Sequence, residues 1–224
     1  MRGLFTGIFT IFWKDLLSEL HTKEFITSIL VFAVLVLVIF NFAFDPDTGV
    51  MELVASGILW VAITFAGVIG LNRTFINEKE NARLEGLMLC PVDRVAIYWG
   101  KLLSSFVFML AVSVVITPIF LILSNLPVLL PGLALIIVLV ILGFASVGTL
   151  FSAIAINTRL RDVMMPILFL PTVVPVVIAA VKATEMVLTS QAWSEMIVWI
   201  NIIIAFDVIY LVVSTLVFEH VIRE

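Results

Sequence analysis

Six long apolar runs separated by shorter polar stretches dominate the pattern of this chain. They lie at Phe25–Phe44, Leu53–Leu71, Leu102–Leu123, Leu133–Ile156, Val163–Val181 and Met196–Phe218. Each reaches roughly the 20 residues that an α-helix needs to cross about 30 Å of hydrocarbon. Because backbone polar groups in lipid must be satisfied within the segment, we predict six transmembrane helices. The predicted fold class is an all-α integral membrane protein in which residues 1–224 form a single transmembrane domain.

The stretch before the first run, Met1–His21, is amphipathic. Its apolar residues recur at three- and four-residue steps; they are Phe5, Ile8, Phe9, Phe12, Trp13, Leu16, Leu17 and Leu20. Its polar residues fall on the other face; they are Lys14, Asp15, Ser18 and Glu19. This pattern predicts a helix in the interface plane, with Trp13 at headgroup depth. Charges interrupt any apolar core, so we do not expect a cleavable signal.

Composition supports lipid as the main solvent of the surface. The chain is 63% hydrophobic and 12% charged, whereas soluble domains are about 45–50% apolar and about 25% charged. The lone Cys90 permits neither an internal disulfide nor a multi-cysteine metal site. His21 and His220 both lie outside the apolar runs, so no pair of His ligands for heme projects into the bilayer. Met109, Met164 and Met165 stay nonspecific candidates, and apolar packing is the favoured role for them. We therefore expect no directly bound metal or cofactor and no nucleic-acid partner.

The basic residues predict the orientation. If the N-terminus is cytoplasmic, eleven of the 12 Lys and Arg residues lie on the inner side and only Lys182 lies outside. The positive-inside rule then places both termini in the cytoplasm.

One polar segment, Asn72–Lys101, is long enough to reach out of the membrane as a cytoplasmic loop. We expect the second helix to continue into it and a short amphipathic helix to form near Leu84–Leu89, which Pro91 ends. Asp93 is placed to cap a new helix that enters the third run. The resulting apolar ridge suits a groove on a partner. The alternative is a solvated loop stabilised by ion pairs.

Two runs contain residues that are unusual for a membrane helix. Pro166, Pro171 and Pro175 in the fifth run predict a bent or broken helix packed against protein. Asp207 lies near the middle of the sixth run and costs roughly 2.5–3.5 kcal/mol there, which the surrounding aliphatic residues offset. We expect it to face the bundle interior, a water cavity or a subunit seam, either as a functional intramembrane residue or as a neutral or hydrogen-bonded packing acid.

The fourth run is rich in small residues, which favours close helix packing over a substrate-lining role. These residues are Gly143, Ala145, Ser146, Gly148, Thr149, Ser152 and Ala153.

Four stretches together resemble the CcmB family of cytochrome c maturation permeases, also called heme exporter protein B. They are GLNRTF (Gly70–Phe75), the charged run Glu78–Arg83, LEGLMLCPVDRVAIYWGK (Leu84–Lys101) and MPILFLPTVVPV (Met165–Val176). The resemblance covers nearly the whole chain. It implies an ABC-2-type permease, similar to the type V exporter fold, in the inner membrane. It also implies a role in heme export or in release of the heme-loaded chaperone CcmE.

The same resemblance implies partners and a docking site. The partners are a second copy of this chain, two copies of a CcmA-type ATPase, and CcmC- and CcmD-type proteins, with CcmE as an indirect partner. Leu84–Pro91 would belong to a coupling helix seated on the ATPase. The candidate docking residues are Arg83, Leu84, Glu85, Leu87, Met88, Pro91, Asp93 and Arg94.

Motif content separates the alternatives. No GxxxxGK[ST] motif occurs, so ATP would be bound and hydrolysed by a separate chain, and this chain would not be an enzyme. An intramembrane hydrolase is disfavoured because Ser146 has no intramembrane His and Asp207 stands alone. An autonomous secondary carrier using Asp207 and the proline-broken fifth helix is the alternative function. A static scaffold remains open.

Overall fold

The computed structural model describes the backbone of residues 2–20, 23–44, 50–80, 93–124, 131–155, 161–189, 191 and 193–221. Within these ranges every regular element is an α-helix. The helices are α1 (Arg2–Leu20), α2 (Lys23–Ala43), α3 (Val50–Glu80), α5 (Arg94–Leu123), α6 (Pro131–Ala155), α7 (Arg161–Leu188) and α8 (Trp193–Val221). A helix therefore lies at each of the six predicted apolar runs.

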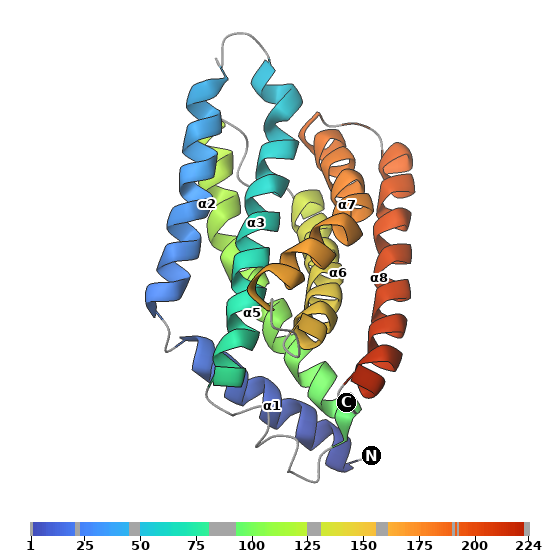
Figure 1. The fold of residues 1–224 in the computed structure, drawn as a ribbon. Helices are drawn as coiled ribbons and strands as arrows, with labels where there is room; N and C mark the ends of the chain where they lie inside the picture. Colours follow the sequence, from blue (N-terminus) through green and yellow to red (C-terminus); the bar gives the residue numbers. More distant parts are fainter. Residues whose placement is uncertain are drawn as a thin grey trace.

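Six helices run lengthwise in alternating directions, and α1 lies across one end of them (Figure 1). The same end, which we call the α1 end, holds the last turns of α3, α6 and α8 and the first turns of α2, α5 and α7. The helix that precedes the bundle and the helix that closes the chain thus meet at one end. The prediction that this end lies in the cytoplasm stays a prediction.

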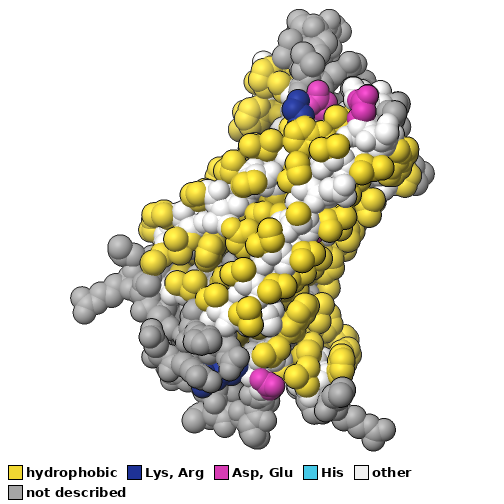
Figure 2. Space-filling view, turned by 90° about the vertical axis from the view of Figure 1, so that its right-hand side faces the viewer, with side chains coloured by type: hydrophobic (Ala, Val, Ile, Leu, Met, Phe, Trp, Pro, Cys, Tyr) yellow, Lys and Arg dark blue, Asp and Glu magenta, His cyan; other side chains and the backbone are white. Residues whose placement is uncertain are grey.

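Five of the lengthwise helices are long and apolar enough to cross a membrane: α3, α5, α6, α7 and α8. The described apolar part of α2, Thr27–Ala43, is shorter. Figure 2 shows a broad hydrophobic band over one face, with charged side chains near its two ends. This is the surface of a multi-pass helical membrane protein. The crossing of α2, which would complete the six predicted spans, stays a prediction.

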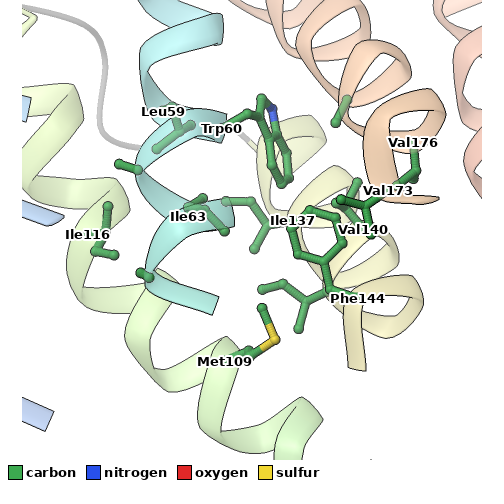
Figure 3. Packing of buried hydrophobic residues seen from close by; sticks show 14 of the residues in the cluster. Leu59, Trp60, Ile63, Met109, Ile116, Ile137, Val140, Phe144, Val173 and Val176 are labelled. Atoms are coloured by element: carbon green, nitrogen blue, oxygen red, sulfur yellow. The ribbon is translucent and has the colours of Figure 1, made fainter. Parts of the chain in front are cut away.

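The core is built around α3 and α6. In α3 and in α6, 72% of the most apolar stretch of the helix is buried inside the protein, whereas in α8 only 22% is buried. Helix α8 therefore faces outward along most of its length. Figure 3 shows Trp60 and Ile63 on the side of α3 that faces Ile137 and Phe144 of α6. The Trp60 indole Nε1 donates a hydrogen bond to Thr184 Oγ1 of α7 at 2.9 Å, which satisfies its polar group within the core.

Small residues of α6 allow close approach of its neighbours. A Cβ on Gly148 would collide with the Leu71 side chain of α3, and the seven small residues predicted to mediate packing are all buried. The prediction that the fourth run serves close helix packing is therefore confirmed at these positions.

The proline-containing helix α7 is continuous from Arg161 to Leu188 and includes Pro166, Pro171 and Pro175. Figure 1 shows that its axis changes direction along its length. Each proline removes a helical hydrogen bond, and Thr172 Oγ1 donates to the Leu168 carbonyl at 2.8 Å, a contact that often accompanies helix bending. Of the two expected outcomes, bent or broken, α7 is bent.

Candidate functional site

The polar segment between the second and third runs is helical at both of its ends. Helix α3 extends to Glu80. Helix α5 begins at Arg94, which is eight residues before the start of the third apolar run at Leu102. Both extensions were expected. Residues 81–92 lie outside the described part of the chain, and with them Arg83, Leu84, Glu85, Leu87, Met88 and Pro91. The short amphipathic helix and its docking role stay predictions.

Asp93 caps α5, as its position in the sequence predicted. It has extended backbone angles, φ −62° and ψ 135°, and its Oδ1 accepts a hydrogen bond from the Val95 backbone N–H at 3.3 Å. The Asp93 carbonyl accepts from the N–H groups of Ala96 and Ile97. The cap fixes the residue at which the chain enters α5.

Replacing Asp93 with Ala should lower the free energy of unfolding by about 1 kcal/mol, because one N–H of the first turn loses its acceptor. Asp93→Asn keeps an acceptor at the same position and is the matched control. Thermal unfolding of the purified protein in detergent compares the two variants. Equal stability of Ala and Asn would show that the cap is energetically unimportant.

Helix α1 packs closely on the start of α5 because Gly100 leaves a notch there. A Cβ on Gly100 would lie 2.8 Å from the Ile11 Cβ and 3.1 Å from the Ile8 carbonyl oxygen. The contact forms a second hydrophobic cluster, separate from the main core, whose buried members are Ile11, Ile97, Tyr98, Leu102, Ala145, Leu150, Ala153 and Phe218. The α1 end is thus a packed unit of α1, α5, α6 and α8.

A buried ion pair lies beside this notch. Lys101 Nζ of α5 is 3.5 Å from Asp15 Oδ2 of α1, and the two side chains are only 2% and 4% exposed. Lys14 Nζ lies 2.8 Å from the other carboxylate oxygen and is 41% exposed. Asp15 is therefore shared between one buried and one exposed ammonium group.

This pair corrects one sequence-based expectation. Asp15 was assigned to a polar face opposite the apolar residues of α1, yet it points into the protein against α5. The reason is that Lys101 provides a buried counter-charge, which a pattern within α1 does not reveal. The spacing of residues in α1 could have predicted this burial, because Asp15 lies four residues after the buried Ile11 and therefore on the same side of the helix.

The outward side of α1 is apolar. Phe5, Phe9, Trp13 and Leu17 follow one another at four-residue steps and are all exposed, and the rings of Phe9 and Trp13 stack with centroids 6.3 Å apart. An apolar outer stripe is the feature that a helix in the membrane interface needs, and the placement of α1 in the interface stays a prediction.

Asp207 lies in the seam between α6 and α8. Although α8 is mostly exposed, this side chain is only 3% exposed. A Cβ on Gly143 would collide with Asp207 Oδ1, and the Phe206 ring flanks the same notch. Neither carboxyl oxygen has a hydrogen-bond partner within the described ranges. Of the expected surroundings, which were the bundle interior, a water cavity or a subunit seam, the described residues place Asp207 inside the bundle between α6 and α8, and its functional role stays a prediction.

Hydroxyl groups lie between Asp207 and the α1 end. The hydroxyls of Tyr98 and Ser146 are 3.1 Å apart and buried. Ser214, also fully buried, follows Asp207 by seven residues, so it lies on the same face of α8 two turns closer to the α1 end. The sequence analysis did not predict that Tyr98 or Ser214 would be buried near Asp207. For Ser214, the seven-residue spacing from Asp207 was a signal that could have predicted it.

Among the residues whose placement is described, no three His, Cys, Asp or Glu side chains gather to hold a metal ion. The candidate site thus has two parts. One is the α1 end, where Asp15–Lys101 joins α1 to α5, and the other is the acid in the α6–α8 seam.

These features define a class, namely a multi-pass helical membrane protein with a helix fixed across one end of its bundle and an acid inside it. A model of the CcmB protein family matches residues 6–224. The chain belongs to the CcmB family.

Curated relatives agree with this assignment. Heme exporter protein B of Pseudomonas aeruginosa is 24% identical over 172 residues, which cover 76% of this chain and 77% of the relative. The protein of the same name from Rhodobacter capsulatus is 28% identical over 66% of this chain and 69% of its own. That of Escherichia coli K12 is 30% identical over 98 residues, or 42% and 44% of the two chains.

Proposed function

We propose that this chain is the permease subunit of a heme-export system that serves cytochrome c maturation, and that a separate ATPase drives it. The observation that carries the proposal is the family match over residues 6–224, together with relatives named heme exporter protein B. The apolar helices supply a membrane body of the size that a permease needs.

The proposed orientation places the α1 end in the cytoplasm and the protein in the inner membrane. The basic side chains Lys14, Arg94 and Lys101 belong to elements at the α1 end, whereas Lys182 lies near the other end and pairs with Glu185 at 2.9 Å. This asymmetry favours a cytoplasmic α1 end under the positive-inside rule. We propose that α2 is the sixth span, because its 21 residues measure roughly 32 Å as an α-helix, about the hydrocarbon thickness.

The proposed docking site for a CcmA-type ATPase is the segment between α3 and α5, at the α1 end. It comprises Arg83, Leu84, Glu85, Leu87, Met88 and Pro91, followed by Asp93 and Arg94. A displacement of this segment would act first on the capped start of α5. Since Lys101 lies two turns further along α5 and pairs with Asp15, α1 would move with it.

The proposed assembly contains two copies of this chain, two ATPase subunits, and CcmC- and CcmD-type proteins that load heme onto CcmE. Two versions of the activity fit it. In one, ATP hydrolysis moves heme across the bilayer; in the other, it releases the heme-loaded chaperone from its neighbours.

Reconstitution tests the proposal. Vesicles that contain this chain and its ATPase should hydrolyse ATP faster than vesicles with the ATPase alone, and the export version predicts ATP-dependent heme movement in them. Normal ATP turnover without heme movement, but with ATP-dependent CcmE release once the CcmC- and CcmD-type proteins are added, selects the second version. Heme movement without the ATPase would contradict both versions and favour an autonomous carrier.

A further inference from the structure

The carboxyl group of Asp207 is a buried polar group without a protein partner. It is 3% exposed, and neither of its oxygens has a hydrogen-bond partner among the described residues. A carboxylate with no counter-charge costs many kcal/mol in an apolar interior, and such groups become neutral instead. The side chain in this seam is therefore stable as the protonated acid.

Possible counter-charges are few on the helices that pack against α8, which are α5, α6 and α7. Helix α6 contains no titratable residue at all. On α7 the titratable groups are Arg161 and Asp162, its first two residues, and Lys182 and Glu185, which pair with each other. On α5 the titratable groups are Arg94, Tyr98 and Lys101, all within its first eight residues.

The other titratable side chains described on α8 itself are Glu195 and Tyr210. None of the titratable groups on these four helices forms a hydrogen bond with Asp207 within the described ranges.

The seam around this acid is closed by the contact between α8 and α6. The Oδ1 atom of Asp207 occupies the notch left by the missing side chain of Gly143. Among the five long apolar helices, α8 has the smallest buried share of its most apolar stretch, 22%. Separation of α8 from α6 would admit water beside the carboxyl group. The hydroxyls of Ser214, Ser146 and Tyr98 lie on the way toward the α1 end and provide the polar groups that water needs there.

We propose that Asp207 is a proton-binding site in the membrane interior, which releases its proton to water when α8 moves away from Gly143 and rebinds one when the seam closes. The step is a simple ionisation, in which the O–H bond breaks, the proton passes to water, and the carboxylate remains until the seam closes. Proton loss and opening of the α6–α8 seam are thus linked, since the charged form is stable only when hydrated.

Infrared spectroscopy of the full-length protein in lipid nanodiscs at pH 7 tests the site without any transport assay. The difference spectrum between the wild type and Asp207→Asn should show the carbonyl band of a protonated carboxylic acid, present only in the wild type. Carboxylate bands in its place would overturn the proposal. Because this readout needs no ATPase and no heme, its failure is distinct from a failure of the proposed function.

Transfer into heavy water tests whether the proton leaves. The carboxylic-acid band should shift as O–H becomes O–D, and Gly143→Ala should speed the shift about tenfold, the change expected for a seam that opens 1.4 kcal/mol more easily. A wild-type band that never shifts would mean that the proton is permanent and would overturn the proposal, whatever the behaviour of Gly143→Ala.

The activity arm of the test rests on the proposed function. Asp207→Asn preserves the size and neutrality of the protonated acid but cannot ionise, so it should yield folded protein with cytochrome c maturation reduced at least tenfold. Asp207→Glu should restore part of the activity because it can bind and release a proton. Full maturation with Asp207→Asn would show that proton release has no role.

Discussion

Asp15→Leu is expected to lower the free energy of unfolding by about 3–5 kcal/mol, the range measured when one partner of a buried ion pair is removed. The substitution leaves the Lys101 ammonium group, which is 2% exposed, without the carboxylate that lies 3.5 Å away. The site also joins α1 to α5, so α1 should detach first. Chemical unfolding in detergent measures the stability, and protease sensitivity of the N-terminus measures the detachment.

Two further variants separate the ion pair from general disruption. Lys14→Met removes the exposed partner of the same carboxylate, 41% exposed and 2.8 Å away, and should cost only about 0–1 kcal/mol. The double variant Asp15→Leu/Lys101→Met removes both buried charges, and it should recover most of the lost stability because the buried ammonium group of Lys101 is removed together with the carboxylate that neutralises it. A double variant as unstable as the sum of the single variants would contradict this account of the α1–α5 contact.

Leu87→Glu is expected to weaken association with the ATPase by about 2–4 kcal/mol, the range for loss of an interface hot spot, or roughly 30- to 1,000-fold in Kd. The proposed docking segment places Leu87 in a short apolar ridge, and a carboxylate would enter the partner's groove without a counter-charge. Copurification of the tagged permease with the ATPase measures the effect.

The matched control is Asn157→Glu, which adds the same charge to the connection between α6 and α7 at the same end of the bundle. It should retain the ATPase. Both variants should reach the membrane in normal amounts, because neither position lies in an apolar span. Retention of the ATPase by Leu87→Glu would refute the proposed docking segment, and its loss with both variants would point to a general charge effect.

Much of the fold follows from the sequence because lipid imposes simple rules. Apolar run length predicted a helix at all six positions, and the cap at Asp93 and the inward direction of Asp207 were predicted from local chemistry. Each of these depends on residues close together in the chain or on the cost of polar groups in an apolar medium.

Contacts between distant segments were not predictable in the same way. Asp15 was assigned to a polar face because its counter-charge, Lys101, lies 86 positions later, and the notch at Gly100 that brings them together is visible only in three dimensions. The same holds for Tyr98 and Ser146. Periodicity within one helix indicates which side is apolar, but the partner helix decides which polar residue is buried.

Labelling of the single cysteine, Cys90, tests most directly the claim that a separate ATPase acts on this permease from the α1 end. A membrane-impermeant maleimide should modify Cys90 in inverted inner-membrane vesicles stripped of the ATPase and not in right-side-out vesicles, and added ATPase should protect it; Cys90→Ala gives the background. Modification in right-side-out vesicles only, or equal modification with and without bound ATPase, would contradict the account.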